Sequence, residues 1–424
     1  MLKSFKIKNF KSILDETISM EHNIRLPNGY RDLDTIVFME NHKMERFIPL
    51  LMIFGANASG KSNLIEAVQV FKKVLKNGIE SNFFPNKLNR KYNTTAFEVS
   101  FSLNNSEYAY TLEYNENSIL KEELLKNGKH LFSINSTFSN NNNVKELTTA
   151  FDIKNIAQKG YGENELHNVF SVECCFNIRH IKSFLWKIVD KYPGLSDFLR
   201  DAREYLSQQI VGAMSNNLSP FWYSDEQENE KELFGKITDI IKRLDIDISR
   251  FETKKELFNP QKSSKEQFLS GLFTKALREE ERIISYHKDT KGQEVQFDFM
   301  SEESTGTKRL FGLIGMFLVA LEKGQTVFID ELDASLHPFL VSFLIRMFKD
   351  KKINTHNAQL IMTTHNPYAM EEDFVRVSDV AFTNKTLNAG TTLQYLYTFE
   401  NVRNTTDFVK QYLEKRLTGI PLIY

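Results

Sequence analysis

A chain of 424 residues is too long to bury one compact core, so two or three structural lobes are expected. The formal charge of −1, from 54 basic and 55 acidic residues, excludes a bulk electrostatic attraction to nucleic acid but leaves a local basic groove open. The two cysteines, Cys174 and Cys175, are adjacent and have no metal-ligand spacing around them, so we interpret them as small core residues in a reducing compartment.

The first twenty residues predict a strand, a turn and a second strand. Met1–Phe10 alternates charged and apolar residues, and Asn9–Ser12 has the composition of a turn. There is no apolar segment of the signal-peptide type, and the longest apolar run, Leu310–Leu321, is too short to span a bilayer. We therefore expect a cytoplasmic protein without membrane contact. Residues 21–47 are charged and irregular, which predicts a loop over the site that follows.

A Walker A phosphate-binding loop comes next. The apolar run Ile48–Phe54 has the length of a buried strand, and apolar residues recur at helical spacing from Leu64 to about residue 77. Between them the chain reads G-x-x-x-x-G-K-S, and strand, glycine-rich turn and helix are the context that this motif requires. The expected nucleotide-binding residues are Gly55, Ala56, Asn57, Ala58, Ser59, Gly60, Lys61, Ser62 and Asn63.

The parts of this loop have distinct roles toward a nucleoside triphosphate. Gly55 and Gly60 let the backbone curl, so that N–H groups point at phosphate oxygens beside the positive end of the helix. Lys61 can reach the β- and γ-phosphates, and the hydroxyl of Ser62 can ligate Mg²⁺. An ordinary glycine turn before Lys-Ser is the alternative, and the flanking strand and helix argue against it.

A β hairpin is predicted after the Walker helix. Phe97–Leu103 and Tyr108–Tyr114 alternate apolar and polar residues on either side of a turn at Asn104-Asn105. The aromatic residues suggest either base stacking or packing of a half-buried sheet, and packing is the more common arrangement.

The middle of the chain predicts helices. Asn135–Val144 is polar and predicts a loop, and from about 150 to 280 the helical period dominates, as in Phe198–Val211 and Leu233–Leu244. The acidic run Asp225–Glu230 is interpreted as solvated surface. No heptad pattern or internal repeat is present.

A second set of functional residues follows the strands predicted at 283–286 and 295–299. Gln325–Glu331 is an apolar strand that ends in two carboxylates, the Walker B pattern. We expect Asp330 in the Mg²⁺ shell and Glu331 to orient or deprotonate the attacking water. An acidic turn after an ordinary strand is the alternative, which an independent Walker A motif makes weaker.

Two further stretches complete the predicted site. Gln359–Asn366 is another strand, and its terminal His365 can reach the γ-phosphate, because parallel sheets bind ligands at the carboxyl ends of their strands. A structural histidine is the alternative. Ahead of Walker B, Ser304, Thr305 and Gly306 open an apolar helix, where they act either as a phosphate-binding signature or as an ordinary helix cap.

These motifs together resemble the ABC-type ATPases, within them the SMC/RecF/OLD branch. The opening "FKIKNFKSI" and the wording "IDELDASLHP" are typical of that branch. Glu303–Leu310 and the tail Tyr412–Pro421 are similar to small bacterial abortive-infection ATPases of the AbiL/RloA type, whose relatives occur in PARIS, Septu and retron defence systems. The strong matches cover residues 1–75 and 283–424.

The resemblance implies an α/β fold: an ABC-type P-loop ATPase head with a mixed or parallel sheet, an antiparallel β lobe and a mainly helical insertion. It places the head in residues 1–135 and 281–424 and the insertion in 136–280. It implies ATP and Mg²⁺ as cofactors. It also implies a homodimer or higher homo-oligomer in which Ser304-Thr305-Gly306 of one subunit completes the Walker site of another.

The sequence departs from the family pattern in several places. The signature is Ser-Thr-Gly-Thr rather than the Ser-Gly-Gly-Gln of transporters, and the tail lacks the usual Gly-Arg-Phe-Gly wording. No Q-loop glutamine can be assigned, since Gln69 falls inside the Walker A helix. Too little chain follows His365 for a Toprim nuclease domain, so any nuclease effector is expected to be a separate protein.

Three functions are compatible with these features. The first is a defence ATPase that senses infection and controls a partner effector such as a nuclease. The second is a DNA-repair or DNA-maintenance ATPase of RecF or SMC type, against which the near-neutral charge argues. The third is a scaffold that assembles on ATP with little turnover, against which Glu331 argues.

Overall fold

The computed structural model describes most of the chain as two compact units. The described residues are 1–22, 35–40, 43–88, 93–138, 144–152, 156, 182–192, 195–213, 230–244, 246–257, 279–386, 390–399 and 408–414. Unit 1 consists of Met1–Asn217, Ala320–Ala334 and Val341–Tyr424, and unit 2 consists of Leu218–Val319 and Ser335–Leu340. Both units are discontinuous in sequence.

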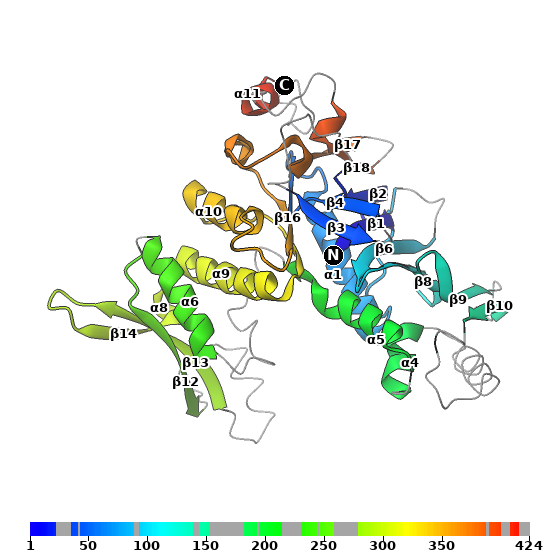
Figure 1. Ribbon diagram of the computed structural model, residues 1–424, viewed down its shortest axis with the longest axis horizontal. Coiled ribbons are helices and arrows are strands. Elements are labelled where there is room, and N and C mark those ends of the chain that lie inside the picture. The colour runs from blue at the N-terminus through cyan, green and yellow to red at the C-terminus, as the bar shows by residue number, and fades with distance from the viewer. Residues whose placement is uncertain are drawn as a thin grey trace. The chain divides into compact units, whose positions relative to one another are not determined.

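Unit 1 is built on one mixed sheet (Figure 1). Among the described residues its strand order is β10-β9-β8-β7-β6-β1-β2-β18-β17-β5-β16-β15-β11. The bounds are β1 Leu2–Phe10, β2 Ile13–Ser19, β5 Leu50–Gly55, β6 Thr95–Leu103, β7 Ser106–Tyr114, β8 Ile119–Lys126, β9 Lys129–Phe138, β10 Val144–Phe151, β11 Ile210–Ala213, β15 Thr326–Ile329, β16 Gln359–Thr363, β17 Val380–Thr386 and β18 Gly390–Tyr395.

One half of this sheet is parallel. The strands β11, β15, β16, β5 and β17 pair side by side in the same direction. Every residue of β5, β15 and β16 is buried, which is the pattern expected where a parallel sheet is covered on both faces. Helix α1, Lys61–Asn77, packs against β1, β5, β11 and β15 through an apolar stripe.

The other half is antiparallel and contains the predicted hairpin. β6 and β7 pair from Thr95↔Tyr114 to Leu103↔Ser106. Asn104 and Asn105 both have positive φ angles, 49° and 56°, as a two-residue turn of the right-handed twist requires. Tyr108, Tyr110 and Tyr114 are almost fully buried, so these aromatic residues pack in the core.

The remaining helices of unit 1 come from distant parts of the chain. Their bounds are α4 Phe184–Lys191, α5 Asp197–Glu204, a π-helical turn Tyr205–Gln209, α10 Pro338–Lys349, of which residues from Val341 belong to unit 1, and α11 Phe408–Leu413. Three short 3₁₀ turns cover Pro367–Glu371, Val377–Asp379 and Leu396–Thr398. A separate hairpin is formed by β3 Ile36–Glu40 and β4 Lys43–Phe47.

Unit 2 is a three-stranded antiparallel sheet with helices beside it (Figure 1). The order is β12-β13-β14, and an aromatic cluster of Phe234, Phe251, Phe299 and Phe311 forms its core. The bounds are α6 Glu230–Arg243, β12 Arg250–Leu257, β13 Glu279–Lys288, β14 Glu294–Asp298, α8 Phe299–Glu302 and α9 Thr305–Lys323, whose residues from Ala320 belong to unit 1.

The structure confirms the predicted α/β class with a mixed sheet and an antiparallel lobe. It corrects several local predictions. Residues 36–40 and 43–47 pair as a hairpin where a loop was predicted, and 135–138 belong to β9. Ile210-Val211 lies in β11 instead of a helix, because this short apolar run pairs with β15. The segment predicted as mainly helical also contains β10 and β12. Cys174, Cys175, residues 225–229 and the tail beyond Glu414 lie outside the described residues.

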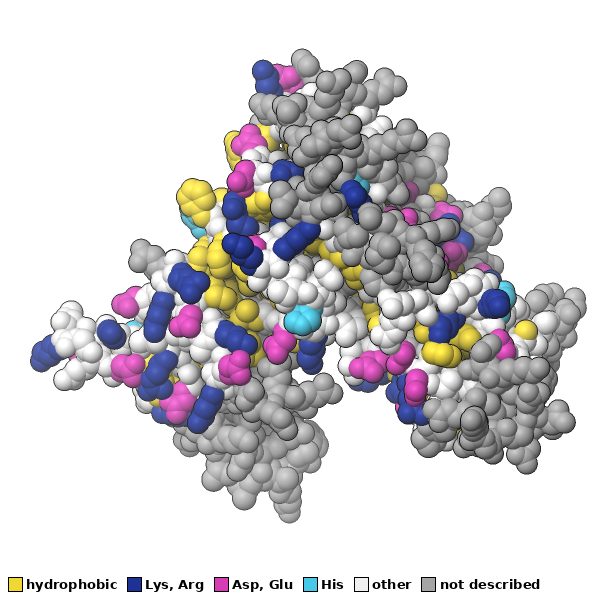
Figure 2. All heavy atoms as spheres, in the orientation of Figure 1, with side chains coloured by type: hydrophobic (Ala, Val, Ile, Leu, Met, Phe, Trp, Pro, Cys, Tyr) yellow, Lys and Arg dark blue, Asp and Glu magenta, His cyan; other side chains and the backbone are white. Residues whose placement is uncertain are grey.

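The visible surface has mixed charge. Figure 2 shows Lys and Arg side chains interspersed with Asp and Glu, in line with the formal charge of −1. Within the described ranges, no helix combines the length and apolar character needed to cross a membrane.

Candidate functional site

The Walker A loop connects β5 to α1 and is shaped by one glycine in particular. Gly60 is the N-terminal cap of α1 with φ 105°, a left-handed conformation that L side chains rarely adopt. A Cβ atom there would lie 2.0 Å from Thr391 Oγ1. At the start of the loop, a Cβ on Gly55 would lie 2.2 Å from Thr383 Oγ1. Only glycine therefore fits at both ends, while Asn57 and Ala58 between them are exposed.

The Lys61 side chain closes this loop from inside. Its Nζ donates hydrogen bonds to the carbonyl oxygens of Gly55, at 2.8 Å, and Ala56, at 3.1 Å. Burial lowers the pKa of Lys61, and the carboxylates of Asp330, Glu331 and Asp333 act in the opposite direction. The ammonium group is therefore desolvated, and carboxylates from the Walker B segment lie within electrostatic range of it.

Hydroxyl groups from distant strands brace the same loop. Thr391 Oγ1 donates to the Ser59 carbonyl at 2.9 Å and lies 2.6 Å from Ser12 Oγ, which accepts a hydrogen bond from Asn63 Nδ2. Ser59 Oγ lies 2.6 Å from Thr383 Oγ1. β17, β18 and the β1–β2 turn thus hold the loop in shape, a contribution that the sequence did not predict.

Asp330 and Glu331 follow β15 and share one hydroxyl group. Thr363, the last residue of β16, donates its Oγ1 hydrogen bond to Asp330 Oδ1 at 2.6 Å and accepts one from the Glu331 backbone N–H at 2.7 Å. Glu331 has φ 49°, an uncommon conformation for a non-glycine residue that often marks functional positions. Thr363 therefore sets both the Asp330 side chain and the direction in which the chain leaves the strand.

His365 lies two residues beyond β16, at the same edge. Its backbone N–H donates to Asp333 Oδ2 at 3.2 Å, and its Nε2 is 3.8 Å from Glu331 Oε1. The Glu331 and His365 side chains are each 41% exposed, whereas Asp330 is 3% exposed. The structure therefore brings together Asp330, Glu331 and His365, with Glu331 and His365 open to an incoming ligand.

These residues fit a nucleotide with its metal ion. Mg²⁺ is commonly held by one or two carboxylates together with substrate phosphates, and Asp330 with the Ser62 hydroxyl offers such a donor set. The glycine-shaped loop at the start of α1 offers backbone N–H groups and a helix N-terminus to phosphates.

The predicted signature residues belong to unit 2. Ser304 precedes α9, and its Oγ accepts a hydrogen bond from the Thr307 backbone N–H at 3.0 Å, so it caps that helix. Ser304 and Thr305 are exposed. A Cβ on Gly306 would lie 3.1 Å from the Ser335 carbonyl oxygen, so the backbone of the segment after Walker B approaches Gly306 closely.

Comparison with known proteins identifies a family. Residues 50–371 match the family described as "AAA domain, putative AbiEii toxin, Type IV TA system", a span that contains both Walker motifs and His365. The chain belongs to this family. No curated protein matches it. Among solved structures, the SMC head domain from Thermotoga maritima is similar with a TM-score of 0.40 and 14% identity, covering 93% of this chain and 98% of that chain.

The sequence predicted the Walker A loop and the carboxylates but missed the residues that support them. Thr363 carries the only usable signal, since it stands in the same stretch as His365. Ser12, Thr383 and Thr391 stand in ordinary strand or turn contexts, so nothing in their local sequence indicates a role. Their importance follows from strand order, which the sequence does not state.

Proposed function

We propose that this AAA-domain protein binds and hydrolyses ATP as an ABC-type ATPase. The observation that carries the proposal is the Thr363 hydroxyl, which holds Asp330 and the Glu331 backbone at the carboxyl edge of the parallel strands. Open α/β sheets bind ligands at this edge. A carboxylate pair organised there, in electrostatic range of a Walker A lysine, has the chemistry of phosphoryl transfer.

Each side chain has a role in that reaction. Lys61 exchanges its two backbone carbonyl partners for the β- and γ-phosphates of ATP. Mg²⁺ bound with the nucleotide would neutralise phosphate charge, with Ser62 and Asp330 as its protein ligands. Glu331 orients the attacking water and accepts its proton. His365 contacts the γ-phosphate and, through its neighbour Glu331, the water.

The proposal includes a second subunit. Ser304, Thr305 and Gly306 lie at the exposed start of α9 in unit 2, where a helix N-terminus and a glycine can approach phosphates. In an ATP-sandwiched homodimer these residues complete the Walker site of the partner. Neither half-site is then competent alone.

We further propose a role in bacterial anti-phage defence, in the cytoplasm, with a separate effector such as a nuclease. Two observations support this role: the family description names an AbiEii toxin of a type IV TA system, and Glu303–Leu310 and Tyr412–Pro421 resemble abortive-infection ATPases. Plating phage on cells that carry the chain with its neighbouring genes tests it. Protection that Glu331→Gln abolishes supports defence, whereas unchanged plating together with DNA-stimulated ATPase activity supports DNA maintenance instead.

Mixing two inactive variants tests the composite site. Lys61→Ala removes the ammonium that pairs with phosphate, and Gly306→Trp obstructs the signature. A mixed dimer contains one site with both defects and one with neither, so we expect ATPase activity to return to a fraction of the parental rate.

Because a side chain at residue 306 must displace the Ser335 carbonyl, Thr305→Arg serves as a second signature variant at an exposed position. Thermal melting of each variant checks folding, and sizing in the presence of ATP follows assembly. A monomer under all conditions, with activity per chain unchanged on dilution, would contradict the dimer.

A further inference from the structure

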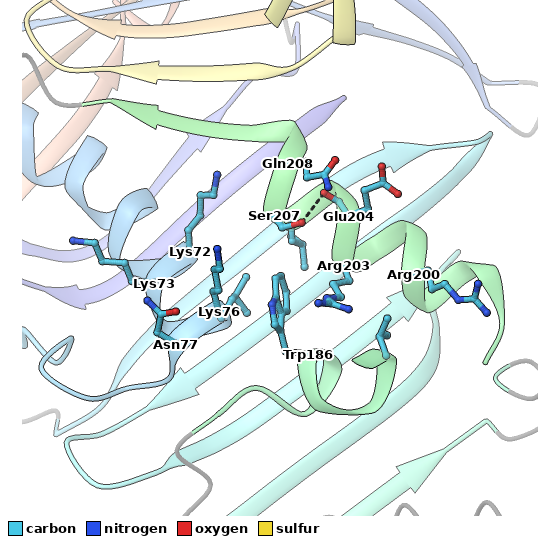
Figure 3. A pocket seen from close by; sticks show the side chains of 13 residues that line it. Lys72, Lys73, Lys76, Asn77, Trp186, Arg200, Arg203, Glu204, Ser207 and Gln208 are labelled. Atoms are coloured by element: carbon cyan, nitrogen blue, oxygen red, sulfur yellow. Dashed lines mark hydrogen bonds between the residues drawn. The ribbon is translucent and has the colours of Figure 1, made fainter. Parts of the chain in front are cut away.

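A basic pocket lies in unit 1 at the C-terminal end of α1, the end opposite the Walker A loop. Its cavity volume is about 730 Å³, and its walls come from α1, α4, α5 and the π-helical turn after α5 (Figure 3). Pockets of roughly 300–1,000 Å³ are the usual size of small-molecule sites. The pocket is therefore large enough for a nucleotide-sized ligand.

The charge of the lining is strongly one-sided. Five of the lining residues are cationic and one, Glu204, is a carboxylate, in a protein whose formal charge is −1. The cations are Lys72, Lys73, Lys76, Arg200 and Arg203. In Figure 3 the lysines approach from α1 on one side, and Trp186 and Arg203 stand across from them.

Helix electrostatics alone does not explain this cluster. A helix C-terminus favours cations in its last turn, which accounts for Lys76. Lys72 and Lys76, however, are four residues apart, a spacing at which like charges destabilise a helix. Burial, followed by the charge of Lys76, lowers the pKa of Lys72 to about 8. The arginines come from a different helix, so tertiary structure assembles the cluster.

Within the described residues, part of this positive charge has no hydrogen-bond or ion-pair partner. Lys72 Nζ donates to the Ile210 carbonyl, and Arg203 pairs with Asp190 at 2.6 Å. Across the ranges that the structure describes, Lys73 and Lys76 form neither a side-chain hydrogen bond nor an ion pair. An anion in the pocket would satisfy them and relieve their mutual repulsion.

The pocket also has an apolar wall. Trp186 is 9% exposed, the Arg203 guanidinium carbon lies 5.2 Å from its ring centroid, and Leu206 and Val189 lie nearby in the lining. An inorganic anion would leave this wall facing water. A ligand that carries both a ring and phosphate groups would cover it and pair with the lysines at once.

We propose that this pocket is a second ligand site, which binds a small phosphate-bearing organic anion of the nucleotide class. Lysine and arginine are the usual phosphate-binding side chains, and an indole offers contact area to a base or sugar. The limited volume, about 730 Å³, favours a small molecule over a nucleic-acid strand, which would need a continuous basic groove.

The site has a direct structural link to the ATPase half of unit 1. Lys72 contacts Ile210, the first residue of β11, and β11 pairs with β15, the strand that leads to Asp330. The other end of α1 begins with Lys61. A ligand on the lysines therefore contacts α1, the helix that begins with Lys61 and whose Lys72 side chain donates to the first residue of β11.

Tryptophan fluorescence tests the proposal directly. The chain has two tryptophans, so Trp222→Phe leaves Trp186 in the pocket wall as the single reporter. We titrate this protein with three probes. ADP carries both the nucleoside and the phosphates, pyrophosphate carries the phosphates alone, and adenosine is the nucleoside alone. We expect a saturable change with ADP at lower concentration than with either of the other two probes.

Four further variants separate this pocket from the Walker site. Lys73→Glu with Lys76→Glu should weaken ADP binding at Trp186 by about tenfold or more, from the loss of charge-assisted hydrogen bonds. Lys129→Glu, at an exposed lysine outside the pocket, is the control for charge reversal. It should change the ADP affinity detected at Trp186 by less than about twofold. Lys61→Ala should leave the Trp186 response intact, and Ser62→Ala provides the same test if Lys61→Ala does not fold.

Four outcomes would overturn the proposal. They are no saturable response to ADP, a response that the Lys73 and Lys76 changes leave intact, a response that disappears with Lys61→Ala or Ser62→Ala, and equal affinity for pyrophosphate and ADP. A response to a fifteen-nucleotide thymidine strand alone would assign the cations to nucleic acid instead. Loss of ATPase activity in Lys61→Ala, with this pocket response retained, separates the present proposal from the proposed function.

Discussion

The two ends of α1 differ in how their chemistry is built. At the N-terminal end, Lys61 belongs to a contiguous motif and donates to the carbonyl oxygens of Gly55 and Ala56, six and five residues earlier. At the C-terminal end, Lys72 and Lys76 meet Arg203, which comes more than a hundred residues later in the chain. The first is a local motif whose lysine is hydrogen-bonded within the loop. The second is assembled by tertiary structure, and two of its lysines, Lys73 and Lys76, have no hydrogen-bond or ion-pair partner among the described residues.

This difference explains why the sequence predicts the phosphate loop at one end of α1 but not the basic pocket at the other. A phosphate loop needs a fixed backbone path, which demands particular residues at particular spacings. A basic pocket needs only cations at the right places in space, and the folded chain can supply them from any element. Substitutions at the two ends of α1 should therefore have different effects on ATP hydrolysis, stability and ligand binding, and the largest are expected at the Walker end.

The largest effect is expected at the Walker end. Glu331→Gln should slow ATP hydrolysis by about 10²–10⁴-fold, because an amide cannot accept a proton from the attacking water. Its backbone N–H still donates to Thr363 Oγ1, so ATP affinity should be retained. Single-turnover hydrolysis and equilibrium binding measure the two effects separately.

Thr363→Val provides the matched comparison for Glu331→Gln, since it removes the hydroxyl that orients Asp330 and Glu331 while leaving both carboxylates. A Glu331→Gln protein that hydrolyses ATP at the parental rate would remove Glu331 from the mechanism. The pocket response of Trp186 should be the same in all three proteins.

The second effect concerns the pH dependence of stability at the pocket end. Burial lowers the pKa of Lys72 from 10.5 to about 8, with Lys76 as the next cause. Between these values the unfolded chain holds a proton that the folded chain has released, so stability rises with pH from about 8 to about 10.5. The total rise is at most about 3 kcal/mol.

Lys72→Met should abolish that part of the rise while keeping the apolar stem in place. Urea unfolding of both proteins at pH 7.5 and 9.5 measures it, and the difference between them cancels groups that titrate in both. Equal slopes in parent and variant would mean that the Ile210 carbonyl compensates the buried charge fully. The other charged groups lining the pocket are Lys73, Lys76, Arg200, Arg203 and Glu204.

The fold was predictable where a single segment carries its own pattern. β5, α1, β15 and β16 were found because buried parallel strands are continuous apolar runs and α1 repeats at 3.6 residues. The β6–β7 hairpin was found from its alternation and its Asn-Asn turn.

The errors have two physical causes. β3 and β4 pair with each other although charged residues interrupt their apolar pattern, whereas Ile210–Ala213 is a strand only because the distant β15 lies beside it. In the same way Thr363, Thr383 and Thr391 become part of the site only through the strand order of the sheet. Local propensity contains no information about such neighbours.

The third effect separates backbone strain from steric clash in the Walker loop. Gly60→Ala should destabilise the protein by about 1–3 kcal/mol and weaken ATP binding, because φ 105° strains alanine and its Cβ would lie 2.0 Å from Thr391 Oγ1. Gly128→Ala is the control, with φ 74° and no heavy atom within 4 Å of the added Cβ.

The steric part of the cost at Gly60 is the difference between these two variants in thermal or urea unfolding. Adding Thr391→Ala to Gly60→Ala should recover some of that difference, since it removes the nearest atoms. Equal costs at both glycines would show that Thr391 moves aside easily and does not brace the loop.

The smallest effect is a gain of affinity at the pocket end. Asp190 is 62% exposed and pairs with Arg203 at 2.6 Å, and such exposed ion pairs contribute roughly 0.2–1 kcal/mol. Asp190→Asn should therefore leave the melting temperature almost unchanged. It removes the carboxylate that competes with a bound phosphate for Arg203, so ADP binding detected at Trp186 should tighten by a few-fold.

Asp197→Asn, at the start of α5 and outside the pocket lining, controls for the change in net charge. Equal affinities in Asp190→Asn and Asp197→Asn would mean that Arg203 does not contact the ligand, and the lysines of α1 and Arg200 would then be the remaining cations of the described lining.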